Sequence, residues 1–238
     1  MKRPYVICHM LSSLDGKING PFMAESAALG LSSAYGEIRE MMGSNAWMYG
    51  TVTTAEFTDF AKPELEKNAK VPEGDFVAEH HEKMYYVSLD TEGQIGWKSA
   101  VYINHGKPSH VIEILTESTP AAYKAFLRKK GISYILAGKD ALDCKKAVEK
   151  LYELFDIKKL VISGGGMINW TFLQAGMIDE LSLVLAPLTD GGSGSASLFT
   201  KQPSSEKGTT VRFDLKAVEH IGGNALHLTY SAENSLKD

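Results

Sequence analysis

The sequence is poor in cysteine. Cys8 and Cys144 are its only two, they lie far apart, and they form no CxxC pair. This composition indicates neither a disulfide framework nor a cysteine zinc site. The combined H-x-E and P-C-x-x-C motif of zinc deaminases is missing as well. The adjacent His80 and His81 would point in different directions in a helix or a strand, so we expect no metal site there.

Long hydrophobic runs and an excess of positive charge are also missing. No stretch approaches the roughly 18 apolar residues of a membrane span. His9 and Asp15 interrupt the first apolar run before it reaches signal-peptide length. The formal net charge is −4, whereas general nucleic-acid-binding proteins usually carry a basic excess. We therefore expect a cytoplasmic protein without a membrane or nucleic-acid partner.

What the sequence does contain is a repeating order of strand and helix patterns. Short apolar runs predict strands at 5–11, 46–49, 84–89, 111–115, 132–136, 159–162 and 181–185. Spacings of three and four residues predict helices at 32–42, after Thr53, after the expected cap Thr119, from Asp140 or Asp143 to 155, and after residue 166. This order is typical of an α/β fold with a mostly parallel central sheet and helices on both faces.

The rest of the chain fits a single domain over residues 1–238. Residues 212–221 and 224–230 flank Gly222-Gly223 and predict an antiparallel hairpin at the edge of the sheet. Residues 62–83 are dense in charge and contain two prolines, which is typical of a surface excursion. Residues 189–210 are rich in glycine and serine and predict a mobile connection.

Three consecutive glycines, Gly164–Gly166, stand between a predicted strand and a predicted helix. Glycine lets the backbone adopt positive φ and approach a bound group, and the start of a helix offers unpaired N–H donors. Together these features predict a phosphate site of the kind that a nucleotide occupies. The motifs GxGxxG and GxxxxGK[ST] are both absent, so a plain turn stays an open alternative.

Other polar groups also follow predicted strands. Ser12–Asp15, Thr53, and Ser88 with Asp90 each come after an apolar run. Ligands of parallel sheets bind beyond the carboxyl ends of the strands. We therefore expect these groups and the glycine turn to line one crevice.

Two residues are candidates for proton transfer. His9 lies inside the first apolar run, and a histidine can titrate near neutral pH. Its alternative role is that of a hydrogen-bonded core histidine. Asp15 is the second candidate, with a turn-forming aspartate as the alternative.

The chain resembles a known family in two motifs. Pro4–Ile7 with Ser13–Ile18 resembles the P-Y-V…S-L-D-G-K-I opening of the reductase domain of riboflavin-biosynthesis deaminase-reductases. Val161–Gly166, followed by Leu173–Leu181 and Ala186-Pro187, is similar to that family's V-x-G-G-G…L-x-A-G-L-V-D-E-L…A-P pattern. The resemblance implies a dihydrofolate reductase-like three-layer fold, a homodimer, and hydride transfer from NADPH to a small heterocyclic or ribosylamino substrate.

The resemblance also assigns roles by position. It implies cofactor contacts at Met10, Leu11, Gly50, Thr53, Ser88, Asp90, Gly164, Gly165, Gly166, Met167 and Ile168, and substrate contacts at Ser13 and Ser163.

The chain departs from the family at three polar substrate positions. His9 stands where lysine is usual, Phe57 and Thr58 replace an aspartate segment A-D-D-P, and Ser163 replaces a glutamate. Gln94 occupies a region where an arginine often meets the 2′-phosphate, so NADH stays possible beside NADPH. A buried polar site discriminates strongly by its hydrogen bonds, so these changes leave the substrate open. A dihydrofolate or pterin reductase and a non-catalytic NADPH-binding dimer are the alternatives.

Overall fold

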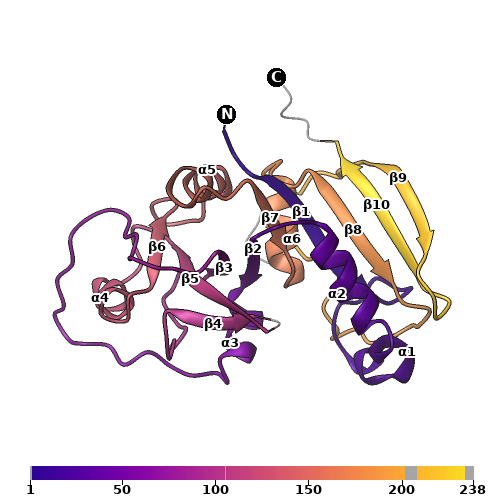
Figure 1. The fold of residues 1–238 in the computed structure, drawn as a ribbon, viewed down its shortest axis with the longest axis horizontal. Helices are drawn as coiled ribbons and strands as arrows, with labels where there is room; N and C mark the ends of the chain where they lie inside the picture. The colour runs from indigo at the N-terminus through magenta and orange to yellow at the C-terminus, as the bar shows by residue number, and fades with distance from the viewer. Residues whose placement is uncertain (1, 105, 202–207, 234–238) are drawn as a thin grey trace. The chain divides into compact units, whose positions relative to one another are not determined.

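The computed structural model describes residues 2–104, 106–201 and 208–233, which form two compact units (Figure 1). Unit 1 comprises Met1–Pro4 and Asn45–Leu160 within those ranges, and unit 2 comprises Tyr5–Ser44 and Val161–Asp238. The division falls inside strand β7 (Lys159–Ile162).

Unit 1 is built on parallel strands. Its strands are β2 (Ala46–Gly50), β3 (Met84–Leu89), β4 (Val101–Asn104), β5 (Lys107–Leu115) and β6 (Ser133–Leu136). β3 pairs in parallel with β2 and β5, β6 pairs in parallel with β5, and β4 is antiparallel to the first half of β5. Residues 109–115 of β5 are all buried, although Ser109, His110 and Glu113 stand among the apolar residues of this segment.

The helices of unit 1 are α3 (Thr51–Phe57), α4 (Ala121–Lys129) and α5 (Cys144–Phe155). The prediction that Asp143 opens α5 is confirmed, because its carboxylate accepts a hydrogen bond from the Lys146 amide at 3.0 Å. Two predicted caps were wrong. α3 begins at Thr51 with Gly50 as its N-cap, and the N-cap of α4 is Pro120, because the Thr119 hydroxyl instead bonds the Thr91 carbonyl at 2.7 Å.

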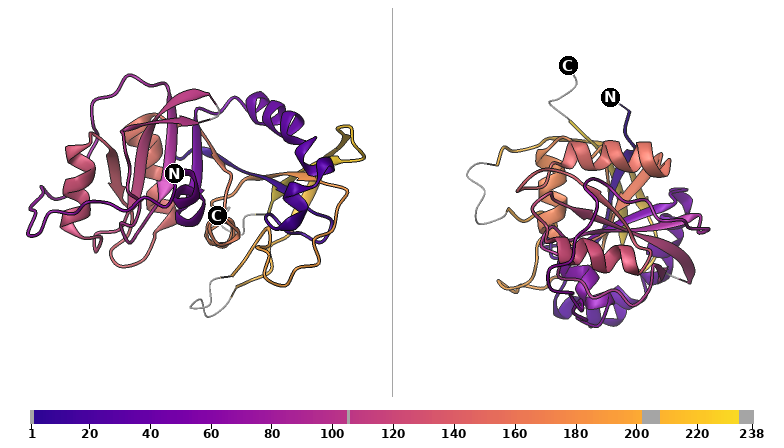
Figure 2. Two further views of the ribbon diagram at one scale, coloured as in Figure 1. Left: turned by 90° about the horizontal axis from the view of Figure 1, so that it is seen from below. Right: turned by 90° about the vertical axis from the view of Figure 1, so that its left-hand side faces the viewer.

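Residues 62–83 contain no helix or strand longer than a single bridge. The segment runs around the outside of α4 (Figures 1 and 2). It is tied down by an ion pair between Glu66 and Lys129 of α4 at 2.7 Å and by the bridge between Phe76 and Tyr134 of β6.

Unit 2 joins parallel and antiparallel strands. β1 (Tyr5–Ser12) pairs in parallel with β8 (Glu180–Leu185), and β10 (Leu226–Ala232) pairs antiparallel with both β8 and β9 (Phe213–His220). Its helical segments are η1 (Pro21–Ala24), α1 (Ser26–Leu29), α2 (Ser32–Met41) and α6 (Gly166–Gln174). Leu31 and Ile38, at the start of α2 and within it, pack with Val184, Ala186 and Ala225.

The α/β class, the mostly parallel pairing and the antiparallel C-terminal hairpin are thus confirmed. Three elements, β4, η1 and α1, were not predicted from the sequence, because each is only four residues long and shows no periodicity. In the described ranges, no helix has the length and apolar character needed to cross a membrane.

The N-cap of α5 gives a test of local stability. Asp143→Ala removes the bond to the Lys146 amide and should lower the free energy of unfolding by about 1 kcal/mol. Urea denaturation measures the change. Asp140→Ala removes an exposed carboxylate from the same loop and should stay within about 0.5 kcal/mol of wild type. Equal losses in both variants would contradict the cap.

Candidate functional site

The predicted site residues fall in both units. Gly50, Thr53, Ser88 and Asp90 belong to unit 1, and all the others belong to unit 2.

The glycine turn of unit 2 has the donors that an anion needs. The first bond of the α6 ladder joins the Asn169 amide to the Gly165 carbonyl at 3.2 Å. The amides of Gly166, Met167 and Ile168 consequently have no acceptor inside the helix. Gly165 has φ 77° and ψ 126°, which glycine adopts without strain. These amides and the helix dipole attract negative charge.

Gly166 has a packing role in addition. A Cβ at this position would overlap the Ser197 carbonyl and lie 2.6 Å from the Thr200 hydroxyl. The Thr200 amide donates to the Gly166 carbonyl at 2.9 Å, and the Asn169 side chain donates to the Leu198 carbonyl at 2.9 Å. Segment 197–200 therefore lies directly on the start of α6. The neighbouring residues 202–207, part of the predicted mobile connection, lie outside the described residues.

Ser163 precedes this turn and carries a buried hydroxyl. Its Oγ finds no hydrogen-bond partner among the residues described. A buried donor without a partner costs roughly 1–3 kcal/mol. An acceptor such as a phosphate oxygen would remove that penalty. The unpaired hydroxyl and the three amides make the turn chemically suited to a nucleotide phosphate.

Asp15 and Ser13 stabilise a loop. The Asp15 carboxylate accepts from the Ser13 hydroxyl at 2.5 Å and from the amides of Asp190 and Gly191 at 3.0 and 2.8 Å. The hydroxyl, followed by the Gly191 and Asp190 amides, holds the pKa of Asp15 well below its usual range. Asp15 is therefore ionised at neutral pH and a poor proton donor. This environment favours the turn-forming alternative.

Met10 and Leu11 stand beside His9 near the end of β1. They pair with Leu183 and Val184 in the ladder to β8. Met10 is buried, and Leu11 packs against the α2 core. Because both side chains pack into the core, the predicted cofactor contact of Met10 and Leu11 would be made by their backbone groups.

His9 is buried beneath α2. Its ring stacks on Tyr35 at 4.1 Å between centroids, and the Tyr35 hydroxyl donates to the His9 carbonyl at 3.0 Å. Nδ1 lies 3.0 Å from the Ser182 hydroxyl, and Nε2 lies 3.4 Å from the Tyr35 carbonyl. Desolvation lowers the pKa of His9 to about 4, and His227 and Arg39 lower it further against the hydrogen bonds to Tyr35 and Ser182. The imidazole is therefore neutral at pH 7. Ser182 was not predicted as a site residue, although it is a polar residue inside the apolar run 181–185.

In unit 1, Gly50 and Thr53 begin α3. Gly50 has φ −78° and ψ 167°, a conformation that any residue adopts. The backbone conformation therefore does not require a glycine at this position. Thr53 is half-buried, whereas Thr54 is buried with its hydroxyl 3.1 Å from the Tyr86 hydroxyl. Thr53 is thus the threonine of this turn whose side chain is partly open to solvent.

Asp90 and Ser88 differ in their bonding. The Asp90 carboxylate accepts from the amides of Gly93, Gln94 and Ile95 at 3.1, 2.6 and 2.8 Å, so it shapes the turn after β3. Burial raises the pKa of Asp90, and these amides act against that rise. The Ser88 hydroxyl is buried beside Glu113, its register partner on β5, and its hydrogen bond acts against the rise in the pKa of Glu113.

Glu113 is a buried carboxyl that was not predicted as a site residue. Its position as a charged residue within the apolar run of β5 is the sequence feature that indicates it. Its Oε1 accepts from the Trp97 indole N–H and lies 3.5 Å from the Tyr123 hydroxyl. Burial, with a smaller contribution from Asp90, raises the pKa of Glu113 well above its usual range. The fold therefore favours the neutral form of this side chain.

An aromatic cluster stands at the position of the family's aspartate segment. Phe57 contacts Tyr49 edge-on at 5.4 Å and stacks on Tyr102 at 6.5 Å. Tyr86 contacts Tyr49, Trp97 and Tyr102 at 4.9, 5.5 and 4.8 Å. The hydroxyl of Thr58, the C-cap of α3, donates to the Thr54 carbonyl at 2.9 Å. This part of unit 1 presents rings where the family presents a carboxylate.

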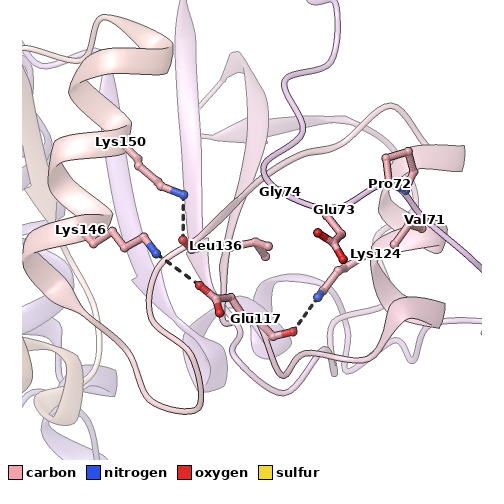
Figure 3. A pocket seen from close by; sticks show the side chains of 9 residues that line it. All are labelled: Val71, Pro72, Glu73, Gly74, Glu117, Lys124, Leu136, Lys146 and Lys150. Atoms are coloured by element: carbon pink, nitrogen blue, oxygen red, sulfur yellow. Dashed lines mark hydrogen bonds and ion pairs between the residues drawn. The ribbon is translucent and has the colours of Figure 1, made fainter.

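Unit 1 also contains a charged pocket of about 460 Å³ (Figure 3). It is lined by Val71, Pro72, Glu73, Gly74, Glu117, Lys124, Leu136, Lys146 and Lys150. Its ammonium groups have partners: Lys146 pairs with Glu117 at 3.4 Å, and Lys124 donates to the Glu117 carbonyl at 2.9 Å. Lys150 pairs with Asp75 at 2.7 Å. The pocket contains none of the predicted site residues.

Within the described ranges, no group of three His, Cys, Asp or Glu side chains is arranged to hold a metal ion. His80 instead stacks on His110 at 4.2 Å.

Together, the parallel strands and the glycine turn of unit 2 define an α/β protein whose turn is chemically suited to a nucleotide phosphate. Residues 4–227 match the family described as the RibD C-terminal domain. The chain belongs to this family, which confirms the resemblance seen in the two sequence motifs.

The relatives are reductases by name. A protein of Methanothermobacter thermautotrophicus called 2,5-diamino-6-ribosylamino-4(3H)-pyrimidinone 5′-phosphate reductase is 29% identical over 108 residues, 45% of this chain and 49% of that protein. A protein of the same name from Aquifex aeolicus is 30% identical over 92 residues, 39% of this chain and 41% of that protein. The chain therefore spans about half the length, or less, of the curated relatives that it matches.

The fold has solved counterparts. A crystal structure of a pyrimidine reductase-like protein from Corynebacterium diphtheriae superposes with a TM-score of 0.65 and 17% identity, covering 96% of this chain and 92% of that chain. At this identity the similarity concerns the fold alone.

The protonation of Glu113 can be tested through stability. A carboxyl with a higher pKa in the folded state loses stability as pH rises from the unfolded towards the folded pKa, by about 1.4 kcal/mol per pH unit. Glu113→Gln cannot ionise and should gain stability relative to wild type as the pH rises above the ordinary range of a glutamate pKa. Chemical denaturation at several pH values measures this, with the exposed Glu92→Gln as control. Parallel profiles for Glu113→Gln and wild type would show an ionised Glu113.

Proposed function

We propose that the chain is a reductase of riboflavin biosynthesis that acts on a ribosylaminopyrimidine 5′-phosphate. The observation that carries this proposal is the family match over residues 4–227, together with two relatives named as reductases of such a substrate. We propose NADPH as the cofactor, with NADH possible because Gln94 replaces an expected arginine. A single reductase domain, a homodimer and a cytoplasmic location complete the proposal.

The proposed cofactor site in unit 2 is the glycine turn. The amides of Gly166, Met167 and Ile168 and the Ser163 hydroxyl would hold its diphosphate. Gly164 and Gly165 would let the backbone approach, and the backbone of Met10 and Leu11 would contact the nicotinamide amide. When bound, the cofactor supplies a hydride to the substrate carbon.

The proposed contacts of unit 1 are Gly50, Thr53, Ser88 and Asp90. The place of Ser88 and Asp90 at the carboxyl end of β3 supports a role at the cofactor ribose. The Asp90 carboxylate holds the turn after β3, because it is bonded to the turn amides. Ser13 is the remaining proposed substrate contact, from the loop that Asp15 stabilises.

We propose His9 as the proton donor rather than Asp15, which is ionised. A neutral imidazole carries one N–H and can donate it if the second nitrogen is reprotonated. Tyr35 covers the ring, so donation requires the Tyr35 side chain to move. The burial of His9 also favours one alternative, the non-catalytic NADPH-binding dimer. Turnover of the ribosylaminopyrimidine phosphate, followed by loss of NADPH absorbance, decides between the two.

Charge at the start of α6 tests the cofactor site. Met167 is 43% exposed in the first helical turn, where an aspartate is well tolerated. Met167→Asp should weaken NADPH binding by about tenfold or more in calorimetric titration, because it repels the diphosphate. Met167→Asn is the neutral control. Equal affinities for the two variants would place the diphosphate elsewhere.

The role of His9 is tested by turnover. His9→Gln keeps a hydrogen-bonding side chain but cannot pass on a proton, so turnover should fall by about 100-fold with little change in NADPH affinity. His110→Gln, at another buried histidine, is the control and should leave turnover near wild type. Wild-type turnover in His9→Gln would make His9 a core histidine.

A further inference from the structure

A line of four hydrogen-bonding side chains crosses the sheet of unit 2. It starts at Glu219 of β9, continues through His227 of β10 and Ser182 of β8, and ends at His9 of β1. The Glu219–His227, His227–Ser182 and Ser182–His9 separations are 3.4, 2.8 and 3.0 Å. Glu219 is 63% exposed, whereas His9 is fully buried. The line thus connects solvent with the buried imidazole.

Strand register produces this line. Glu219 pairs with His227 across β9 and β10, and Ser182 pairs with His9 across β8 and β1. Paired residues of neighbouring strands place their side chains on the same face. The diagonal contact between His227 and Ser182 joins the two pairs.

We propose that this line is a proton conduit to His9 in which the positive charge resides on His227. The proposal rests on the reductase function and deepens it, because it identifies how a buried neutral histidine can donate a proton repeatedly.

The serine hydroxyl makes the line directional. Ser182 has one proton and can donate to only one of its two histidine neighbours. When His227 is protonated on both nitrogens, its Nε2–H donates to Ser182. Ser182 must then donate to Nδ1 of His9, so the His9 proton sits on Nε2.

When His227 is neutral, the arrangement reverses. Its Nδ1–H faces Glu219, and its Nε2 accepts from Ser182. Ser182 then accepts from Nδ1–H of His9, which leaves Nε2 without a proton. The protonation of His227 therefore determines which nitrogen of His9 carries hydrogen.

Proton donation converts the first arrangement into the second. His9 Nε2–H passes to the substrate, the Ser182 proton passes to His9 Nδ1, and the His227 Nε2–H passes to Ser182. His227 becomes neutral, and the His9 proton now lies on Nδ1. For the next donation, water beside Glu219 returns a proton to His227, and water that enters when the Tyr35 side chain moves transfers the His9 proton from Nδ1 back to Nε2. One proton leaves and one enters, and His9 is neutral before and after. This agrees with the low pKa that burial gives His9.

The charged and titratable neighbours fit this division of charge. The Glu219 carboxylate lies 3.4 Å from Nδ1 of His227, on the side away from Ser182. Arg39 of α2 disfavours a cation at His9. Tyr35, also from α2, meets the His9 ring by stacking and through its carbonyl.

Nitrogen-15 NMR of histidine-labelled protein tests the conduit without any substrate. In wild type, the nitrogen-15 shifts of the His9 ring should report a change of tautomer. This change should have the same pH midpoint as the titration of His227. In Ser182→Ala, His227 should still titrate while His9 no longer follows. His220→Gln, an exposed histidine of the same hairpin, is the control and should retain the coupling. A His9 tautomer that stays constant through the His227 titration in folded wild type would overturn the proposal.

Turnover then tests whether the reaction uses the conduit. His227→Gln can still donate to Ser182 but cannot release a proton, so turnover should fall about tenfold or more and lose its decline at rising pH. Unchanged turnover in His227→Gln would overturn the proposal even if the tautomers are coupled. If wild type reduces no ribosylaminopyrimidine phosphate, the proposed function fails, and the NMR titration still decides whether the line moves a proton.

Discussion

The parallel register between β1 and β8 is the constraint on which the chemistry of unit 2 depends. It sets His9 beside Ser182, and a shift of one residue would turn every side chain of β1 to the opposite face. His9 would then lose both Ser182 and the Tyr35 ring. β1 is buried on both faces, so the same shift would also move its apolar side chains out of their packed positions.

A buried hydroxyl without a hydrogen-bond partner is a second indication of where a ligand makes contact. Most buried polar groups in this protein have partners, as Asp90 does with three amides. The Ser163 hydroxyl is an exception, and it directly follows β7, at the end of a strand where ligands of parallel sheets bind. Burial favours the neutral form of Glu113, which avoids the cost of a buried charge.

Periodicity was sufficient to predict the α/β class, most strands and the Asp143 cap, because these follow from local pattern. The predicted cap of α3 lay three residues after the observed Gly50, and that of α4 lay one residue before the observed Pro120. The Thr119 hydroxyl does not cap α4 because it bonds Thr91, which is distant in sequence. The candidate residues could be named from motifs, but their states could not. The neutral His9 and the ionised Asp15 depend on Tyr35, Ser182, Asp190 and Gly191, contacts that only the folded chain reveals.

A buried imidazole that donates protons while staying neutral is the central claim. A proton inventory of turnover in mixtures of light and heavy water tests it most directly, because several protons move in one step along the line from His227 to the substrate. A curved dependence on deuterium content in wild type, which becomes linear in Ser182→Ala, is the predicted result. A linear dependence in both proteins would contradict the claim.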